Sequence, residues 1–86
     1  MDKYLIEFLG TAFFLFVIIS TENALAIGAA LAIAILIGSD VSRCHFNPAV
    51  SVMYTIAGKM PVYELLPSVI AQVLGGLVAL EIFKNI

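Results

Sequence analysis

The chain contains very little charge. Of its 86 residues, 4 are Lys or Arg and 6 are Asp or Glu, so charged residues make up 12% of the sequence. A soluble domain of this size needs a polar surface, which so few charges cannot supply. The chain also lacks a basic cluster, so we expect no nucleic-acid partner. Integration into a lipid bilayer is the interpretation that remains.

Cysteine and histidine are almost absent as well. One cysteine, Cys44, allows no disulfide within the chain. Its neighbour His45 is the only histidine, and the sequence holds no second pair that would complete a metal site. Ser42 or Ser51 with His45 shows no sign of an oxyanion site. We therefore expect no metal, no cofactor and no enzymatic activity.

Long apolar runs dominate what is present. Hydrophobic residues make up 63% of the chain, and the mean hydropathy is +1.14. Crossing a bilayer takes about 20 apolar residues, with a range of about 17 to 25. Residues 4–20, 24–38 and 61–83 are predicted to be helices of this kind, although the second is short, while residues 48–57 are too short to span. The sequence predicts an all-α membrane protein over residues 1–86, with three transmembrane helices and one re-entrant half-helix.

A signal peptide is an alternative interpretation of the first run. Lys3, the apolar residues after it and Ala24-Leu25-Ala26 imitate the three parts of such a peptide. However, Glu7 lies inside the supposed apolar core, and the apolar pattern continues beyond the cleavage site. We therefore favour a membrane helix that stays in the protein.

A polar break at residues 40–47 interrupts the apolar pattern. Irregular backbone at membrane depth must line a cavity or be buried in protein, because lipid offers it no hydrogen bonds. Asn47 is a suitable helix N-cap, and Pro48 suits the first helical position. A half-helix that begins there directs its positive dipole end and an amide donor into the membrane interior.

Polar and small residues inside the apolar runs indicate packing partners. We expect Glu7 to accept hydrogen bonds from backbone N–H groups of the polar break rather than to lie at the headgroup level. Gln72 either serves the same loop or bonds another helix. Small residues in the second and third runs predict close helix packing. In the third run these are Ser68, Ala71, Gly75, Gly76 and Ala79.

Three motifs together resemble a known family. Residues 45–51, His-Phe-Asn-Pro-Ala-Val-Ser, resemble the first Asn-Pro-Ala box of the aquaporin and glycerol-facilitator (major intrinsic protein) family. Residues 7–11 resemble its opening helix, and residues 71–76 resemble its third helix. The motifs occur in the family's order and extend over the whole chain, which makes the resemblance specific.

The resemblance implies one half of the aquaporin-like fold, because the family combines two inverted repeats. It also implies roles at a pore where two half-helices meet. Asn47 would be the pore donor, Pro48 and Ala49 would shape the meeting point, and His45 would lie near the pore. Glu7 would steady the loop, with Gln72 as a second support.

The chain departs from the family at several positions. The aromatic filter position of the second helix falls on Ile27 or on Ile33, depending on the alignment, so the constriction should be apolar. Arg43 and Cys44 stand where the family usually has small residues. We place Cys44 at a pore mouth, where a thiol reagent would narrow the path. A buried, inert cysteine is the alternative.

The resemblance implies a channel component that passes water or small uncharged solutes. A single repeat would conduct only after pairing with a second half, and an inverted homodimer is the simplest arrangement. The alternative is a non-conducting remnant, or a regulatory or assembly subunit of a full-length channel. Family topology would place three of the four basic residues on one side, which favours a single orientation.

Overall fold

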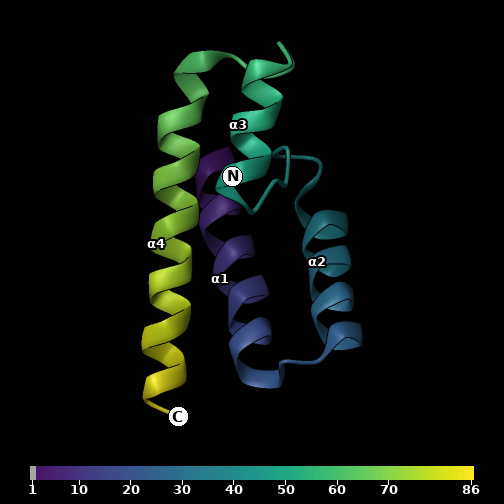
Figure 1. Ribbon diagram of the computed structural model, residues 1–86, viewed down its shortest axis with the longest axis vertical. Helices are drawn as coiled ribbons and strands as arrows, with labels where there is room; N and C mark the ends of the chain where they lie inside the picture. The colour runs from purple at the N-terminus through teal and green to yellow at the C-terminus, as the bar shows by residue number, and fades with distance from the viewer. Residues whose placement is uncertain (1) are drawn as a thin grey trace.

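The computed structural model describes residues 2–86, and within them it shows four α-helices and a short 3₁₀ turn (Figure 1). The predicted helix ends agree with the observed ones to within one residue, except where the last helix begins. There, residues 62–64 form the 3₁₀ turn before α4. The elements are α1 (Lys3–Thr21), α2 (Ala24–Gly38), α3 (Pro48–Ile56), η1 (Val62–Glu64) and α4 (Leu65–Lys84).

Side-chain caps define where the first two helices begin. The Asp2 carboxylate accepts from the N–H groups of Tyr4 and Leu5 at 2.7 and 3.1 Å. The Asn23 side chain accepts from the Ala26 N–H at 3.0 Å. These bonds satisfy donors that a helix start leaves unpaired. Both caps are local, so each helix begins where the sequence places a short polar side chain.

Helix α1 packs against both α4 and α2. Its approach to α4 is close, because a Cβ added at Gly75 would lie 2.6 Å from the Phe8 carbonyl oxygen. The buried face of α4 confirms the predicted small-residue face, whereas on α2 the space around Gly28 is open. The buried residues of α4 are Ser68, Ala71, Gln72, Gly75 and Ala79.

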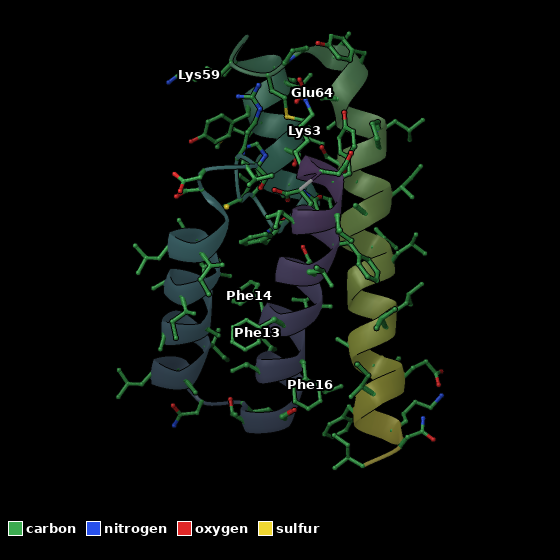
Figure 2. The ribbon with its side chains drawn as sticks, turned by 180° about the vertical axis from the view of Figure 1, so that it is seen from behind. Lys3, Phe13, Phe14, Phe16, Lys59 and Glu64 are labelled. Carbon is green, nitrogen blue, oxygen red and sulfur yellow. The ribbon has the colours of Figure 1, made fainter. Side chains whose placement is uncertain are left out.

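The bundle measures 39 × 24 × 23 Å, and its longest dimension is close to the roughly 40–45 Å thickness of a bilayer with its headgroups. α4 runs the full length, whereas α3 occupies one end and begins near the middle of the long axis (Figure 1). Lys3, Lys59 and Glu64 lie at that same end, while Phe16 lies toward the other (Figure 2). Within residues 2–86, two helical stretches are long and apolar enough to cross a membrane: α1 (Lys3–Thr21) and η1 with α4 (Val62–Lys84).

The polar break folds as an irregular loop between α2 and α3. Cys44 and Phe46 both have φ of 54°, in the left-handed region that side chains disfavour. The left-handed backbone at these two residues turns the Phe46 side chain inward, where only 2% of the residue is exposed. A Cβ at Gly10 would collide with the Phe46 ring, so glycine at this position makes room for the loop.

Candidate functional site

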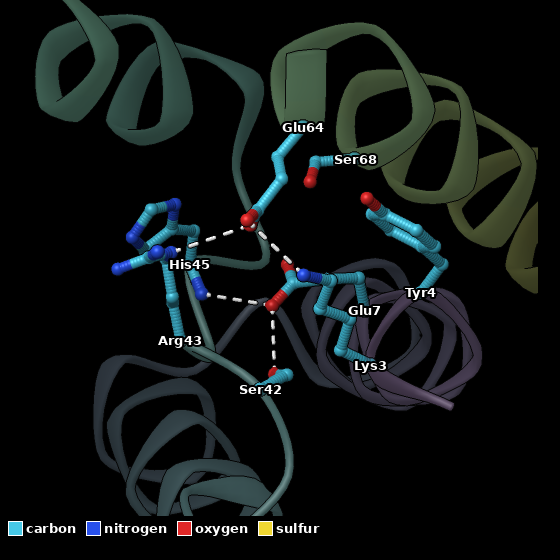
Figure 3. Close-up of a pocket in the computed structure, with 8 residues that line it drawn as sticks. All are labelled: Lys3, Tyr4, Glu7, Ser42, Arg43, His45, Glu64 and Ser68. Carbon is cyan, nitrogen blue, oxygen red and sulfur yellow. Dashed lines mark hydrogen bonds and ion pairs between the residues drawn. The ribbon is translucent and has the colours of Figure 1, made fainter. Parts of the chain in front are cut away.

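The carboxylate of Glu7 is the centre of the loop's hydrogen bonding. One oxygen accepts from the Phe46 N–H at 2.9 Å and from Gln72 Nε2 at 3.0 Å. The other accepts from the His45 N–H at 3.2 Å and from Ser42 Oγ at 2.9 Å (Figure 3). Four donors saturate the lone pairs of a carboxylate. Glu7 is 4% exposed, so a buried charge on α1 is compensated by the loop and by α4.

Ser51 extends this network into α3. Its hydroxyl accepts from Gln72 Nε2 at 2.9 Å and lies 2.9 Å from Nδ1 of His45. The His45 ring lies 4.6 Å from the ring of Tyr54, tilted by 32°. Burial lowers the pKa of His45, against the opposing effect of the Glu7 carboxylate. Ser51 received no role in the sequence analysis, although it belongs to the recognised motif.

Asn47 lies at the N-cap of α3 and is exposed. Its side-chain oxygen accepts from the Ala49 N–H at 2.8 Å, and Pro48 occupies the first helical turn. Pro48 is half-buried, and Ala49 is exposed next to it. The cap bond fixes the orientation of the Asn47 side chain, so its amide NH₂ group faces outward at the start of α3.

Glu64 ties together three segments at the same end of the bundle. It forms ion pairs with Lys3 Nζ at 3.1 Å and with Arg43 Nε at 3.6 Å, while its own side chain is 7% exposed. Arg43 also donates to the Lys59 carbonyl at 3.1 Å. No role for Glu64 was predicted from the sequence. A signal was present, because Glu64, like Glu7, is an acid near the start of an apolar run.

A small polar cavity lies between the Glu7 and Glu64 clusters. Its volume is about 10 Å³, which is close to the minimum that holds one water molecule. The lining side chains come from α1, the loop, η1 and α4 (Figure 3). They are Lys3, Tyr4, Glu7, Ser42, Arg43, His45, Glu64 and Ser68.

The predicted exposure of Cys44 at a pore mouth is wrong. Cys44 is 6% exposed and packs in a core cluster with Ala34 and Phe46. Its N–H donates to Ser42 Oγ at 2.9 Å, and its positive φ directs the side chain inward. The alternative of a buried cysteine is therefore confirmed, and its low reactivity stays a prediction. The large side chain of Arg43 is accommodated in the loop because it extends away from this core to Glu64.

The two isoleucines considered for the constriction lie in different surroundings. Ile33 is 47% exposed and lines an apolar groove of about 490 Å³. Ile27 is half-buried and does not line this groove. The groove lies between α1 and α2, and Phe46 of the loop also lines it. Its lining residues are Ile6, Leu9, Gly10, Phe13, Ile33, Ala34, Ile37, Gly38 and Phe46.

Comparison with known proteins finds relatives that are named glycerol uptake facilitator or aquaporin. The chain is 36% identical to glycerol uptake facilitator protein-like 6 of Lactiplantibacillus plantarum, over 99% of the chain and 44% of that protein. It is 37% identical to aquaporin-8 of Notomys alexis, over 92% of the chain and 34% of that protein. With aquaporin Z of Brucella melitensis it shares 47% identity, over 69% of the chain and 26% of that protein.

The chain thus spans less than half the length of these curated relatives. No solved structure matches it. The sequence profile described as "Major intrinsic protein" matches residues 1–86, the whole chain. Together with the helical bundle, this match shows that the chain belongs to the major intrinsic protein family, whose members are integral membrane proteins.

Proposed function

We propose that this chain is a channel component for water or small uncharged solutes, and that it conducts only when paired with a second half. One observation carries the proposal. The exposed amide of Asn47 lies at the start of a half-helix that begins near the middle of the bundle (Figure 1). Glu7 and Gln72 support that start from α1 and α4.

The length of α3 explains the need for a second half. Nine residues of helix extend about 14 Å, less than half of a hydrocarbon core of about 30 Å. The polar path would therefore end at Asn47. Unpaired polar groups facing lipid cost several kcal/mol each, so they require water or a partner. The relatives, at more than twice the aligned length, are consistent with a missing half.

An inverted homodimer is the arrangement that we favour. It would bring two Asn47 residues together at the bilayer centre, about a two-fold axis in the membrane plane. A parallel dimer would leave the opposite leaflet without a polar path. The basic residues favour a single orientation, which counts against dual insertion. The family resemblance places Val50 where the family's second Asn-Pro-Ala box carries its filter arginine, so a pore with Val50 in both halves should exclude cations less strongly.

The chemistry of the groove favours uncharged solutes. Its lining is apolar, and the exposed residue that follows Phe46 in the sequence, Asn47, carries a neutral amide. A charged solute would lose its hydration there without a compensating partner, which is costly at membrane depth. We therefore propose water or a small uncharged solute as the cargo, with Ile33 rather than Ile27 at the apolar wall.

A second candidate is a non-conducting assembly subunit of a full-length channel. The open surface at Gly28 on α2 favours it, because small residues permit close approach of another helix in lipid. In this case the chain would bind a complete channel through α2. It would show no flux by itself.

Stopped-flow light scattering of proteoliposomes that contain only the purified chain tests the proposal. Water or glycerol flux above empty vesicles supports a channel component, and flux at the level of empty vesicles contradicts self-sufficient pairing. Crosslinking of Asn47→Cys in a Cys44→Ser background tests the inverted dimer. Labelling of Lys3 and Lys84 from each side reports orientation. Uniform orientation without a disulfide would rule out the inverted arrangement.

A further inference from the structure

Gln72, Ser51 and His45 form a chain of hydrogen bonds in which each group can donate to the next. We propose that Ser51, oriented by Gln72 and Glu7, is a positioning residue that fixes His45 as a neutral hydrogen-bond donor with its proton on Nε2. The role of that donor toward a solute rests on the proposed function. The protonation pattern itself follows from contacts within the chain.

The first step concerns the orientation of the Gln72 amide. The carboxylate of Glu7 only accepts hydrogen bonds, so the Gln72 atom 3.0 Å from it is the NH₂ group. The second N–H of this group points to Ser51 Oγ at 2.9 Å. In this orientation Gln72 Oε1 is buried without a partner among the described residues. Glu7 therefore determines which way the amide faces.

The second step concerns the hydroxyl of Ser51. It is completely buried and accepts from Gln72. A hydroxyl has one proton to donate. Within residues 2–86 the remaining partner of this oxygen is His45 Nδ1 at 2.9 Å. If Nδ1 carried a proton, the hydroxyl proton would face no acceptor. Nδ1 therefore accepts, and the imidazole proton lies on Nε2.

The third step concerns what the fixed imidazole offers. Tyr54 packs beside the ring at 4.6 Å between centroids, and His45 is only half-buried. No hydrogen bond from the described part of the chain engages Nε2. The Nε2–H group belongs to His45, which stands two residues before Asn47 in the sequence. We infer that the loop offers two neutral donors in sequence, suited to the acceptor oxygen of water or of an uncharged hydroxyl compound.

NMR of the chain labelled with ¹⁵N-histidine tests the proposal, because His45 is the only histidine. In bilayers near neutral pH, we expect one signal set with unprotonated Nδ1 and protonated Nε2. Ser51→Ala should shift the Nδ1 resonance and allow a population with protonated Nδ1. Thr55→Ala is the matched control, because its hydroxyl donates to the Ser51 carbonyl instead. It should leave both resonances unchanged.

The outcomes separate this proposal from the proposed function. A protonated Nδ1 in the wild type, or an unchanged Nδ1 resonance in Ser51→Ala, overturns the role of Ser51 whether or not the chain conducts. The expected spectra from a chain without flux would support the positioning role and contradict conduction by copies of this chain alone. In a conducting chain, Ser51→Ala should lower permeability severalfold while Thr55→Ala does not.

Discussion

The side chain of Gln72 donates to the carboxylate of Glu7 at 3.0 Å across 65 residues of sequence. This bond joins α4 to α1 beneath the loop that carries Asn47. The same amide group reaches Ser51, so one side chain connects two spanning helices with the half-helix. The position of Asn47 thus depends on both ends of the chain.

Replacing Glu7 tests whether its charge stabilises the fold. In a lipid-facing site, Glu7→Leu would remove a costly charge and raise stability. We expect a loss of about 3 kcal/mol or more, because several buried donors lose their acceptor at about 1–3 kcal/mol each. Thermal unfolding in detergent measures this. Exposed Glu81→Leu is the control and should change stability by about 0.5 kcal/mol or less.

Asn47 and Asn23 form a matched pair of helix caps. Each side-chain oxygen accepts one backbone N–H at the start of its helix. Asn47→Ala and Asn23→Ala should each cost about 1 kcal/mol of stability. In a conducting preparation, only Asn47→Ala should abolish solute flux in proteoliposomes. Full permeability in that variant would show that Asn47 is not the pore donor.

Gly75 and Gly28 offer opposite environments for the same substitution. Gly75→Ala places a methyl group against the Phe8 carbonyl oxygen, so α1 and α4 must separate. We expect a loss of about 1–3 kcal/mol. Gly28→Ala meets open space and should gain up to about 1 kcal/mol from helix propensity. Equal melting temperatures for the two variants would contradict the close packing of α1 on α4.

The burial of Cys44 predicts slow reaction with thiol reagents. With 6% exposure and a position in the core, it should be labelled by a maleimide only after unfolding. Ser39→Cys in a Cys44→Ser background provides an exposed reference thiol and should react rapidly. Mass spectrometry of the folded protein measures both. Labelling of Cys44 at the rate of the reference would restore the pore-mouth placement.

The pKa of His45 predicts a pH dependence of stability. Burial lowers this pKa from its ordinary value of 6.5, while Glu7 raises it and Arg43 lowers it; Tyr54 packs against the ring. The folded protein then binds the proton less tightly than the unfolded chain. Stability should therefore fall as the pH drops below about 6.5. Melting temperatures from pH 8 to 5, compared with His45→Gln, isolate the effect. An identical slope in the variant would assign it to other groups.

Local signals in the sequence were sufficient to predict the helices. Apolar length identified α1 and α4, and the Asn47-Pro48 pair marked where α3 begins, because capping depends on neighbouring residues. The start of α4 was less well predicted. Residues after Pro61 form a 3₁₀ turn that brings Glu64 toward Lys3, and this contact depends on the folded bundle.

The site was harder to predict because its partners are distant in sequence. The sequence predicted that Glu7 accepts hydrogen bonds from backbone N–H groups of the loop, and in the structure those of His45 and Phe46 donate to it. The function of Glu7 in a pore stays a prediction. Ser51 has no periodicity or spacing that indicates Gln72 as a partner. The burial of Cys44 follows from a left-handed φ that no local residue pattern announced.

The bond between Gln72 and Glu7 also sets an order of events during biosynthesis. At about 5–20 residues per second, the ribosome adds Gln72 roughly 3 to 13 seconds after Glu7. During that interval Glu7 can already accept from the N–H groups of His45 and Phe46, but the Glu7 carboxylate and the Ser51 hydroxyl still lack the donor that Gln72 provides. The network that joins α1, α3 and α4 is therefore completed only after α4 has been synthesised.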